Sequence, residues 1–108
     1  MAKREIIRKP CVAGRFYPGS KAGLEKSVAS YLVDAPKEDA LVLICPHAGY
    51  MYSGKTAGMA FSSVNIPDRI ILIGPNHTGM GPYVSVMASG TWEIPTGQVE
   101  VDEELASE

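Results

Sequence analysis

The sequence has no apolar run close to the roughly 20 residues that a membrane-spanning helix needs. No apolar h-region follows its charged start, so a secretory signal peptide is not indicated. There are only two cysteines, Cys11 and Cys45, which stand in unlike contexts and form no CxxC pair. Such cysteines are typical of reduced thiols rather than of a disulfide framework. We therefore expect a cytoplasmic protein that does not bind a membrane.

An excess of positive charge is also missing, because the formal net charge is −2 at pH 7. Neutralising the phosphates of a nucleic acid requires a basic face. One short basic cluster occurs near the start of the chain, where Glu5 interrupts it, and it consists of Lys3, Arg4, Arg8 and Lys9. The sequence therefore favours a protein without a nucleic-acid partner.

The length of 108 residues and the hydrophobic content of 45% are those of one globular domain at most. Residues 1–20 contain KPCVAGRFYPGS, in which two prolines and two glycines bracket a short apolar piece. This pattern predicts an irregular arm. Residues 21–108 are expected to form an α/β core.

Three helices are predicted from caps and apolar spacing. A first helix is expected from Lys21 to about Asp34, after a cap at Ser20, because apolar residues recur with helical spacing at Leu24, Val28, Tyr31 and Leu32. Ser53 is expected to cap a second helix, whose apolar stripe consists of Ala57, Ala60, Phe61 and Val64. Asp102 is expected to cap a third helix that begins in VDEELASE, because carboxylates favour a helix N-terminus.

Two short apolar runs, ALVLIC at residues 40–45 and RIILIG at residues 69–74, are each followed by a proline and a polar loop. Runs of this kind are typical of strands that are buried on both faces of a parallel sheet. Alternation in YVSVMAS predicts a third strand at residues 83–89. A strand, a helix and a strand in this order predict a βαβ unit with parallel strands. The expected fold class is therefore α/β with a parallel βαβ core.

Residues 49–56, GYMYSGKT, match the phosphate-loop pattern GxxxxGK[ST], which binds nucleotides where it joins a buried strand to a helix. Bulky side chains at Tyr50, Met51 and Tyr52 count against this function, because backbone must approach a phosphate closely there. The first glycine also lies three residues beyond the expected strand, and the next strand offers no aspartate to orient magnesium. Nucleotide binding is therefore a minor alternative.

His47 and His77 are the only histidines, and each follows the carboxyl end of an expected parallel strand by two or three residues. Ligands of open α/β sheets bind in the crevice outside these ends, so neighbouring strands would bring both imidazoles to one place. Each histidine could instead hydrogen-bond only within its own loop. Two nitrogens alone make a weak metal site, and a stable mononuclear centre usually has a third protein ligand.

Four blocks, in this order and spacing, make the chain similar to the Memo family: VAGRFYPGS, PHAGYMYSG, ILIGPNHTG and GTWEIPTGQVEVDEELA. The resemblance covers essentially the whole chain. It implies that residues 1–108 are the amino-terminal portion of a single Memo-like domain that is normally more than twice as long. Memo-family proteins resemble the catalytic subunits of class III extradiol dioxygenases, which implies a three-layer open sheet with a mononuclear iron site at its carboxyl edge.

The resemblance implies that His47 and His77 are metal ligands, with iron(II) as the expected cofactor and another divalent metal as the alternative. The family's further histidine and its cysteine ligand lie in a later part, and neither Cys11 nor Cys45 matches them. That missing part, or a second chain, would then complete the site. The aromatic residues of the first two blocks, Phe16 and Tyr52, are implied to line the substrate cleft.

Two functions follow as expectations. The first is a dioxygenase-type redox enzyme that uses non-haem iron and a small aromatic or enediol substrate. The second is a non-catalytic module that binds a peptide or a protein partner in the same cleft. No residue of this chain is assigned a catalytic role, so the sequence leaves open whether the protein is an enzyme.

Overall fold

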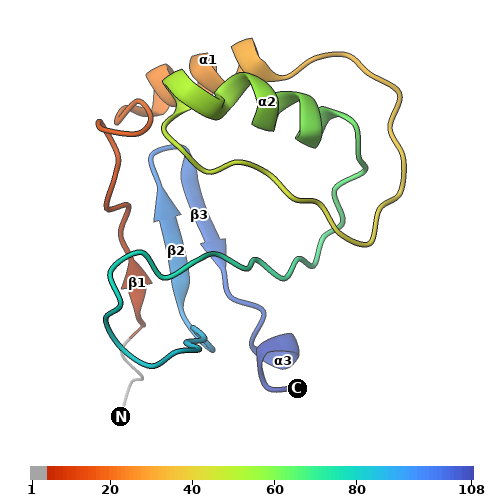
Figure 1. Ribbon diagram of the computed structural model, residues 1–108. Coiled ribbons are helices and arrows are strands. Elements are labelled where there is room, and N and C mark those ends of the chain that lie inside the picture. The colour runs from red at the N-terminus through yellow and green to blue at the C-terminus, as the bar shows by residue number, and fades with distance from the viewer. Residues whose placement is uncertain (1–4) are drawn as a thin grey trace.

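The computed structural model describes residues 5–108, and the fold is α/β with a small sheet. Its elements are β1 (Ile7–Arg8), α1 (Lys21–Tyr31), α2 (Tyr50–Ser62), β2 (Thr91–Ile94), β3 (Gly97–Glu100) and α3 (Glu103–Ala106). In Figure 1 the pair α1 and α2 lies above the sheet, and α3 lies below it near the carboxyl end. Lys3 and Arg4 of the basic cluster, and the first part of the expected arm, lie outside the described residues.

The sheet is mixed and joins the two ends of the described chain. Its order is β1-β2-β3, in which β1 pairs with β2 in parallel and β2 pairs with β3 antiparallel. The backbone N–H of Thr91 donates to the carbonyl of Ile6 at 2.8 Å, and its buried hydroxyl donates to Glu5 at 2.7 Å. The expected arm is therefore irregular except at Ile7–Arg8, where it contributes an edge strand.

Two of the three predicted helix caps are confirmed. The Ser20 hydroxyl accepts a hydrogen bond from the backbone of Gly23 at 3.0 Å, so α1 begins where expected, although it ends at Tyr31 rather than near Asp34. Asp102 accepts from the backbone of Leu105 at 3.0 Å and begins α3.

The predicted cap at Ser53 is wrong, because α2 begins three residues earlier, at Tyr50, with Gly49 as its N-cap. Ser53 lies inside the helix, and its hydroxyl donates to the carbonyl of Ala48 at 2.9 Å. The serine therefore ties the helix to the preceding loop instead of capping a backbone N–H.

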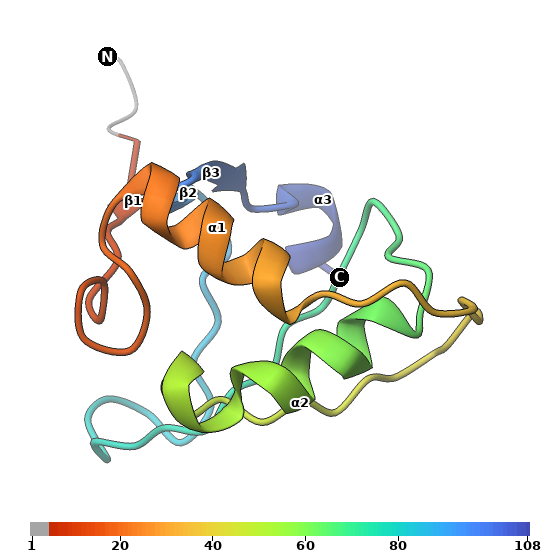
Figure 2. The ribbon, with the colours of Figure 1, turned by 90° about the horizontal axis from the view of Figure 1, so that it is seen from above.

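The helices α1 and α2 lie side by side in both views (Figures 1 and 2) and are brought together by glycines of α2. Gly54 and Gly58 are buried against Tyr31, the last residue of α1. A Cβ at Gly54 would lie 2.7 Å from the Tyr31 ring, and a Cβ at Gly58 would clash with the Tyr31 carbonyl. The glycine face of α2 therefore packs on α1.

The strands predicted at residues 40–45, 69–74 and 83–89 are absent from the described part of the chain. A strand needs a neighbour with which to share backbone hydrogen bonds, and segments 40–45 and 69–74 make no such bonds to another part of the described chain. Before them, Glu38 and Val64 form an isolated parallel bridge, with Glu38 N–H donating to Ser63 at 2.9 Å and Asn65 N–H donating to Glu38 at 3.0 Å. This bridge is parallel, but no parallel ladder follows it.

Both described cysteines, Cys11 and Cys45, are free thiols, as expected. Within residues 5–108 no helix has the length and apolar character that crossing a membrane requires.

Candidate metal centre

His47 and His77 meet where the loops after segments 40–45 and 69–74 converge. Their Nε2 atoms lie 3.1 Å apart, and their ring centroids are separated by 5.1 Å with the planes tilted by 43°. Both side chains are exposed, so a third group can approach them from solvent. The two segments run in the same direction from the Glu38 and Val64 bridge (Figure 1), and this common direction delivers both imidazoles to one place.

The loop that carries His77 is held by the neighbouring side chain of Asn76. Its Oδ1 accepts hydrogen bonds from the backbone N–H groups of Thr78 at 3.1 Å and Gly79 at 3.0 Å. Its amide nitrogen donates to the carbonyl of Met80 at 2.8 Å. An asparagine that bonds to the backbone two or three residues further on stabilises a turn. Asn76 therefore orients the loop from which His77 projects.

The loop that carries His47 is held from two sides. The Ser53 hydroxyl bonds to the carbonyl of Ala48 from within α2. The backbone N–H of Tyr50 donates to the carbonyl of Phe16 at 2.7 Å, which ties the start of α2 to the amino-terminal arm. His47 is thus positioned by the arm and by α2 together.

The histidine pair fits two positions of a metal centre but does not complete one. With metal–nitrogen distances of about 2.0–2.1 Å, two nitrogens separated by 3.1 Å subtend about 100° at the metal, between octahedral and tetrahedral angles. Among residues 5–108, no cluster of three or more His, Cys, Asp or Glu side chains is arranged to hold a metal. A metal bound here would therefore need a further ligand from outside the described residues, or from solvent.

A cavity of about 310 Å³ opens beside His47, between the arm, α1 and α2. Its aromatic wall consists of Phe16, Tyr17, Tyr31, Tyr50 and Phe61. The Tyr50 ring lies 5.6 Å from that of Tyr17 and meets that of Tyr31 edge-on at 6.0 Å. Burial raises the pKa of the Tyr50 phenol above its ordinary value, and Tyr17 adds to this rise. The cavity therefore suits an apolar or aromatic group next to an imidazole.

Of the two predicted cleft residues, Phe16 lines this cavity and Tyr52 does not. Tyr52 is 84% exposed, because it lies two residues after Tyr50 and each helical residue turns by about 100°, which places it on nearly the opposite face of α2. Tyr52 therefore lies outside this cavity, whose wall contains Tyr50. Because α2 begins at Tyr50, the register of this helix turns Tyr50 toward the cavity and Tyr52 away from it.

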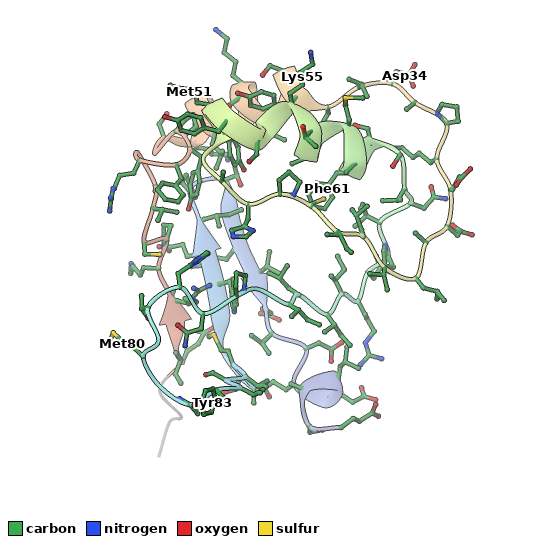
Figure 3. All side chains as sticks on the ribbon, in the orientation of Figure 1. Asp34, Met51, Lys55, Phe61, Met80 and Tyr83 are labelled. Carbon is green, nitrogen blue, oxygen red and sulfur yellow. The ribbon has the colours of Figure 1, made fainter. Side chains whose placement is uncertain are left out.

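The phosphate-loop interpretation of residues 49–56 is wrong, because nearly all of them belong to α2. The backbone N–H groups of Tyr52 and Ser53 already donate to Gly49, so they are not free to surround a phosphate. Figure 3 shows Lys55 on the side of α2 that points away from the sheet and into solvent. GYMYSGKT is therefore a helix start with a chance match to the pattern.

Comparison with known proteins identifies relatives over nearly the whole chain. Residues 8–108 match the model of the family described as "Memo-like protein". A "MEMO1 family protein" of Aquifex aeolicus is 46% identical over 101 residues, which cover 92% of this chain and 38% of the relative. A protein with the same description from Sulfurisphaera tokodaii is 43% identical over 117 residues, covering 94% of this chain and 41% of the relative.

The chain thus spans about two fifths of the length of the curated relatives that it matches. No solved structure matches it. The family match and the Aquifex and Sulfurisphaera relatives agree with the four sequence blocks, and they cover the loops of His47 and His77. The chain belongs to the Memo-like protein family.

Proposed function

We propose that the chain contributes His47 and His77 as two ligands of a mononuclear divalent-metal centre, with iron(II) as the expected metal. The observation that carries the proposal is the separation of 3.1 Å between the two Nε2 atoms, which suits a shared metal ion. Asn76 and Ser53 hold the two loops before any metal binds, which lowers the cost of assembling the site.

The proposed activity is that of a non-haem iron dioxygenase-type redox enzyme acting on a small aromatic or enediol substrate. Iron(II) bound in this way would supply open positions at which dioxygen and substrate are activated. The residues of this chain bind the metal and orient the substrate. His47 and His77 hold the metal, and the wall formed by Phe16 and Tyr50 receives an apolar ring and excludes water. The parallel bridge between Glu38 and Val64, which precedes segments 40–45 and 69–74, supports the likeness to class III extradiol dioxygenase subunits.

A third ligand belongs to this proposal, supplied by a second chain or by the part of the Memo-like fold that this chain does not span. The relatives' greater length supports this source. We place the activity in the cytoplasm, where the free thiols of Cys11 and Cys45 would stay reduced.

The second candidate is a non-catalytic module that binds a peptide or a protein partner through the same cleft. The apolar and aromatic lining of the cavity beside His47 favours it, because such walls accept side chains of a partner as readily as a substrate ring. Oxygen consumption separates the two candidates, since only the enzyme turns over.

The test is an anaerobic equilibrium dialysis of the chain against iron(II), because a site with only two protein ligands binds too weakly to keep its metal through desalting. The double substitution of His47→Ala and His77→Ala should abolish iron uptake, whereas Met80→Leu, on the same loop as His77, should leave it unchanged. Equal iron content in the double variant would refute the metal centre. With iron loaded, no oxygen uptake across a panel of catechols and enediols would favour the binding module.

A further inference from the structure

The cavity beside His47 extends along α2 from a histidine end to an apolar end. Its lining includes Tyr50 in the first turn of α2 and Phe61 in the last turn, which lies roughly 16 Å further along the helix. Figure 3 shows Phe61 below α2, on the side opposite Lys55. Leu32 lines the same apolar end, because it follows Tyr31, whose carbonyl lies against Gly58 of α2. A substrate that presents polar groups to His47 would therefore extend its other end toward hydrocarbon.

The cavity offers no side chain that could pair with a charged substituent. Within the described part of the chain, its lining includes no Lys, Arg, Asp or Glu. Arg15, which precedes Phe16, is exposed and does not belong to the lining. Burying a carboxylate or an ammonium without a partner of opposite charge is costly. A charged substituent therefore meets a penalty here that an uncharged one avoids.

The start of α2 does not compensate by binding an anion. A helix N-terminus holds anions through free backbone N–H groups. Here the N–H of Tyr50 donates to the carbonyl of Phe16 at 2.7 Å, and those of Tyr52 and Ser53 donate to the carbonyl of Gly49 at 2.9 and 3.1 Å. Burial also raises the pKa of the Tyr50 phenol, so this environment disfavours a negative charge.

The cavity volume of about 310 Å³ lies at the lower end of the range of small-molecule sites, about 300–1,000 Å³, so it suits one substituted ring. We infer that the substrate is a catechol or enediol whose far end is uncharged and apolar, and that the cavity discriminates against analogues with a carboxylate or an ammonium at that end. This inference rests on the proposed function, because it specifies the substrate of the same site. Leu32 is then a specificity-determining residue.

The test compares three catechols with short tails of different charge: methyl dihydrocaffeate is uncharged, dihydrocaffeate is an anion and dopamine is a cation at pH 7. Each is titrated into the isotope-labelled, metal-free chain and followed by NMR. Shifts of the Ser53 and Gly58 amides locate binding, because both residues line the cavity. The uncharged ester should bind at least about tenfold more tightly than either charged probe, because it buries no unpaired charge.

A cation placed at the apolar end should remove the discrimination against the anion. Leu32→Lys adds an ammonium at the end of α1, where a positive charge also favours the helix C-terminus, so the fold should be kept. The preference for the ester over dihydrocaffeate should fall below about threefold, because the carboxylate gains a partner. The matched control is Val33→Lys, at a neighbouring residue that is equally exposed, 48%, but does not line the cavity, and it should keep the preference.

These titrations separate the inference from the metal centre, because they use the metal-free chain. A chain that takes up no iron but prefers the ester would refute the metal centre and support the charge selectivity of the cavity. Equal affinities for the three probes, or tighter binding of dihydrocaffeate or dopamine, would overturn the inference even if iron binds. An absence of shifts at Ser53 and Gly58 with millimolar ester would overturn it too. A preference that is unchanged in Leu32→Lys would do the same, because it would arise outside the cavity.

Discussion

The Nε2 atoms of His47 and His77 share one hydrogen bond, so one of these nitrogens carries a hydrogen and the other accepts it. A metal ion needs a free lone pair on both atoms. Metal binding would therefore displace that hydrogen and replace the bond with two metal–nitrogen bonds. The pair is preassembled by its loops, and this preassembly can be weakened without touching either imidazole.

Substitution of Asn76→Ala removes three backbone hydrogen bonds that hold the His77 loop. We expect metal affinity to fall about tenfold, the lower end of the losses seen when the support of a metal ligand is removed, because the loop that positions His77 is loosened. Anaerobic cobalt(II) titration, followed by the visible spectrum, measures the effect. Met80→Leu serves as the control, because it changes the loop surface but keeps the carbonyl that Asn76 contacts. An affinity unchanged in Asn76→Ala would mean that the loop does not position His77.

Alanine at Gly58 and alanine at Gly54 should differ in their effect on stability. The added methyl at residue 58 meets the backbone carbonyl of Tyr31, which cannot move aside, and we expect a loss of about 1–3 kcal/mol in the free energy of unfolding. At residue 54 the methyl meets only the Tyr31 ring, and the higher helix propensity of alanine, about 1 kcal/mol, offsets the displacement. Urea denaturation of both variants checks this order, and a Gly54→Ala variant that is the less stable of the two would contradict the α1–α2 packing.

Tyr50 and Tyr52 provide a second matched pair. Tyr50→Ala removes a ring packed between Tyr17 and Tyr31, and we expect a cost of about 2 kcal/mol in the free energy of unfolding. Tyr52→Ala removes an exposed ring and should change this free energy by less than about 0.5 kcal/mol. Thermal unfolding followed by circular dichroism compares them. Equal losses of stability in the two variants would contradict this placement, because they would mean that the Tyr52 ring is packed as closely as that of Tyr50.

Asp102 should make stability depend on pH in acid. The hydrogen bond from the Arg69 guanidinium lowers the pKa of Asp102, and the backbone N–H of Leu105 lowers it further. A carboxyl group with a lowered folded-state pKa stabilises the fold above its unfolded pKa of about 3.9, and this contribution disappears as pH falls through the folded value. We expect a small effect that salt weakens, because the pair is exposed.

The variant Asp102→Asn tests this dependence, since it keeps an acceptor for the α3 cap but removes the charge. Urea midpoints measured from pH 6 to pH 2 should fall less steeply for this variant than for the native chain. Parallel curves for the two proteins would assign the acid dependence to other carboxylates.

Features set by local chemistry could be predicted from the sequence. Ser20 and Asp102 cap helices through hydrogen bonds to residues only three positions away, so each cap is contained in a short stretch of sequence. Gly49, the N-cap of α2, has no side chain that would mark it as a cap, so the cap was predicted at Ser53 instead. The hairpin of β2 and β3 was missed, although Pro95 and Thr96 before Gly97 carried a turn signal.

Features set by neighbours could be predicted only in part. The convergence of His47 and His77 followed correctly from the parallel direction of two segments. The sheet expected from segments 40–45 and 69–74 does not form in the described chain. Apolar composition indicates that a segment will be buried, but it does not identify the segment's neighbour. Which tyrosine of α2 lines the cavity depends on the start of the helix at Tyr50, and the sequence alone did not indicate that start.

The bridge between Glu38 and Val64 bears on the order in which the chain folds. Its neighbours Asp39 and Asn65 are 26 residues apart, whereas Glu5 and Thr91, which join β1 to β2, are 86 residues apart. Closing the shorter loop costs roughly 1 kcal/mol less conformational entropy. Local contacts of this kind form sooner than distant ones. The segment closed by this contact, which carries His47 and α2, is therefore expected to assemble first, and the sheet that joins the two ends last.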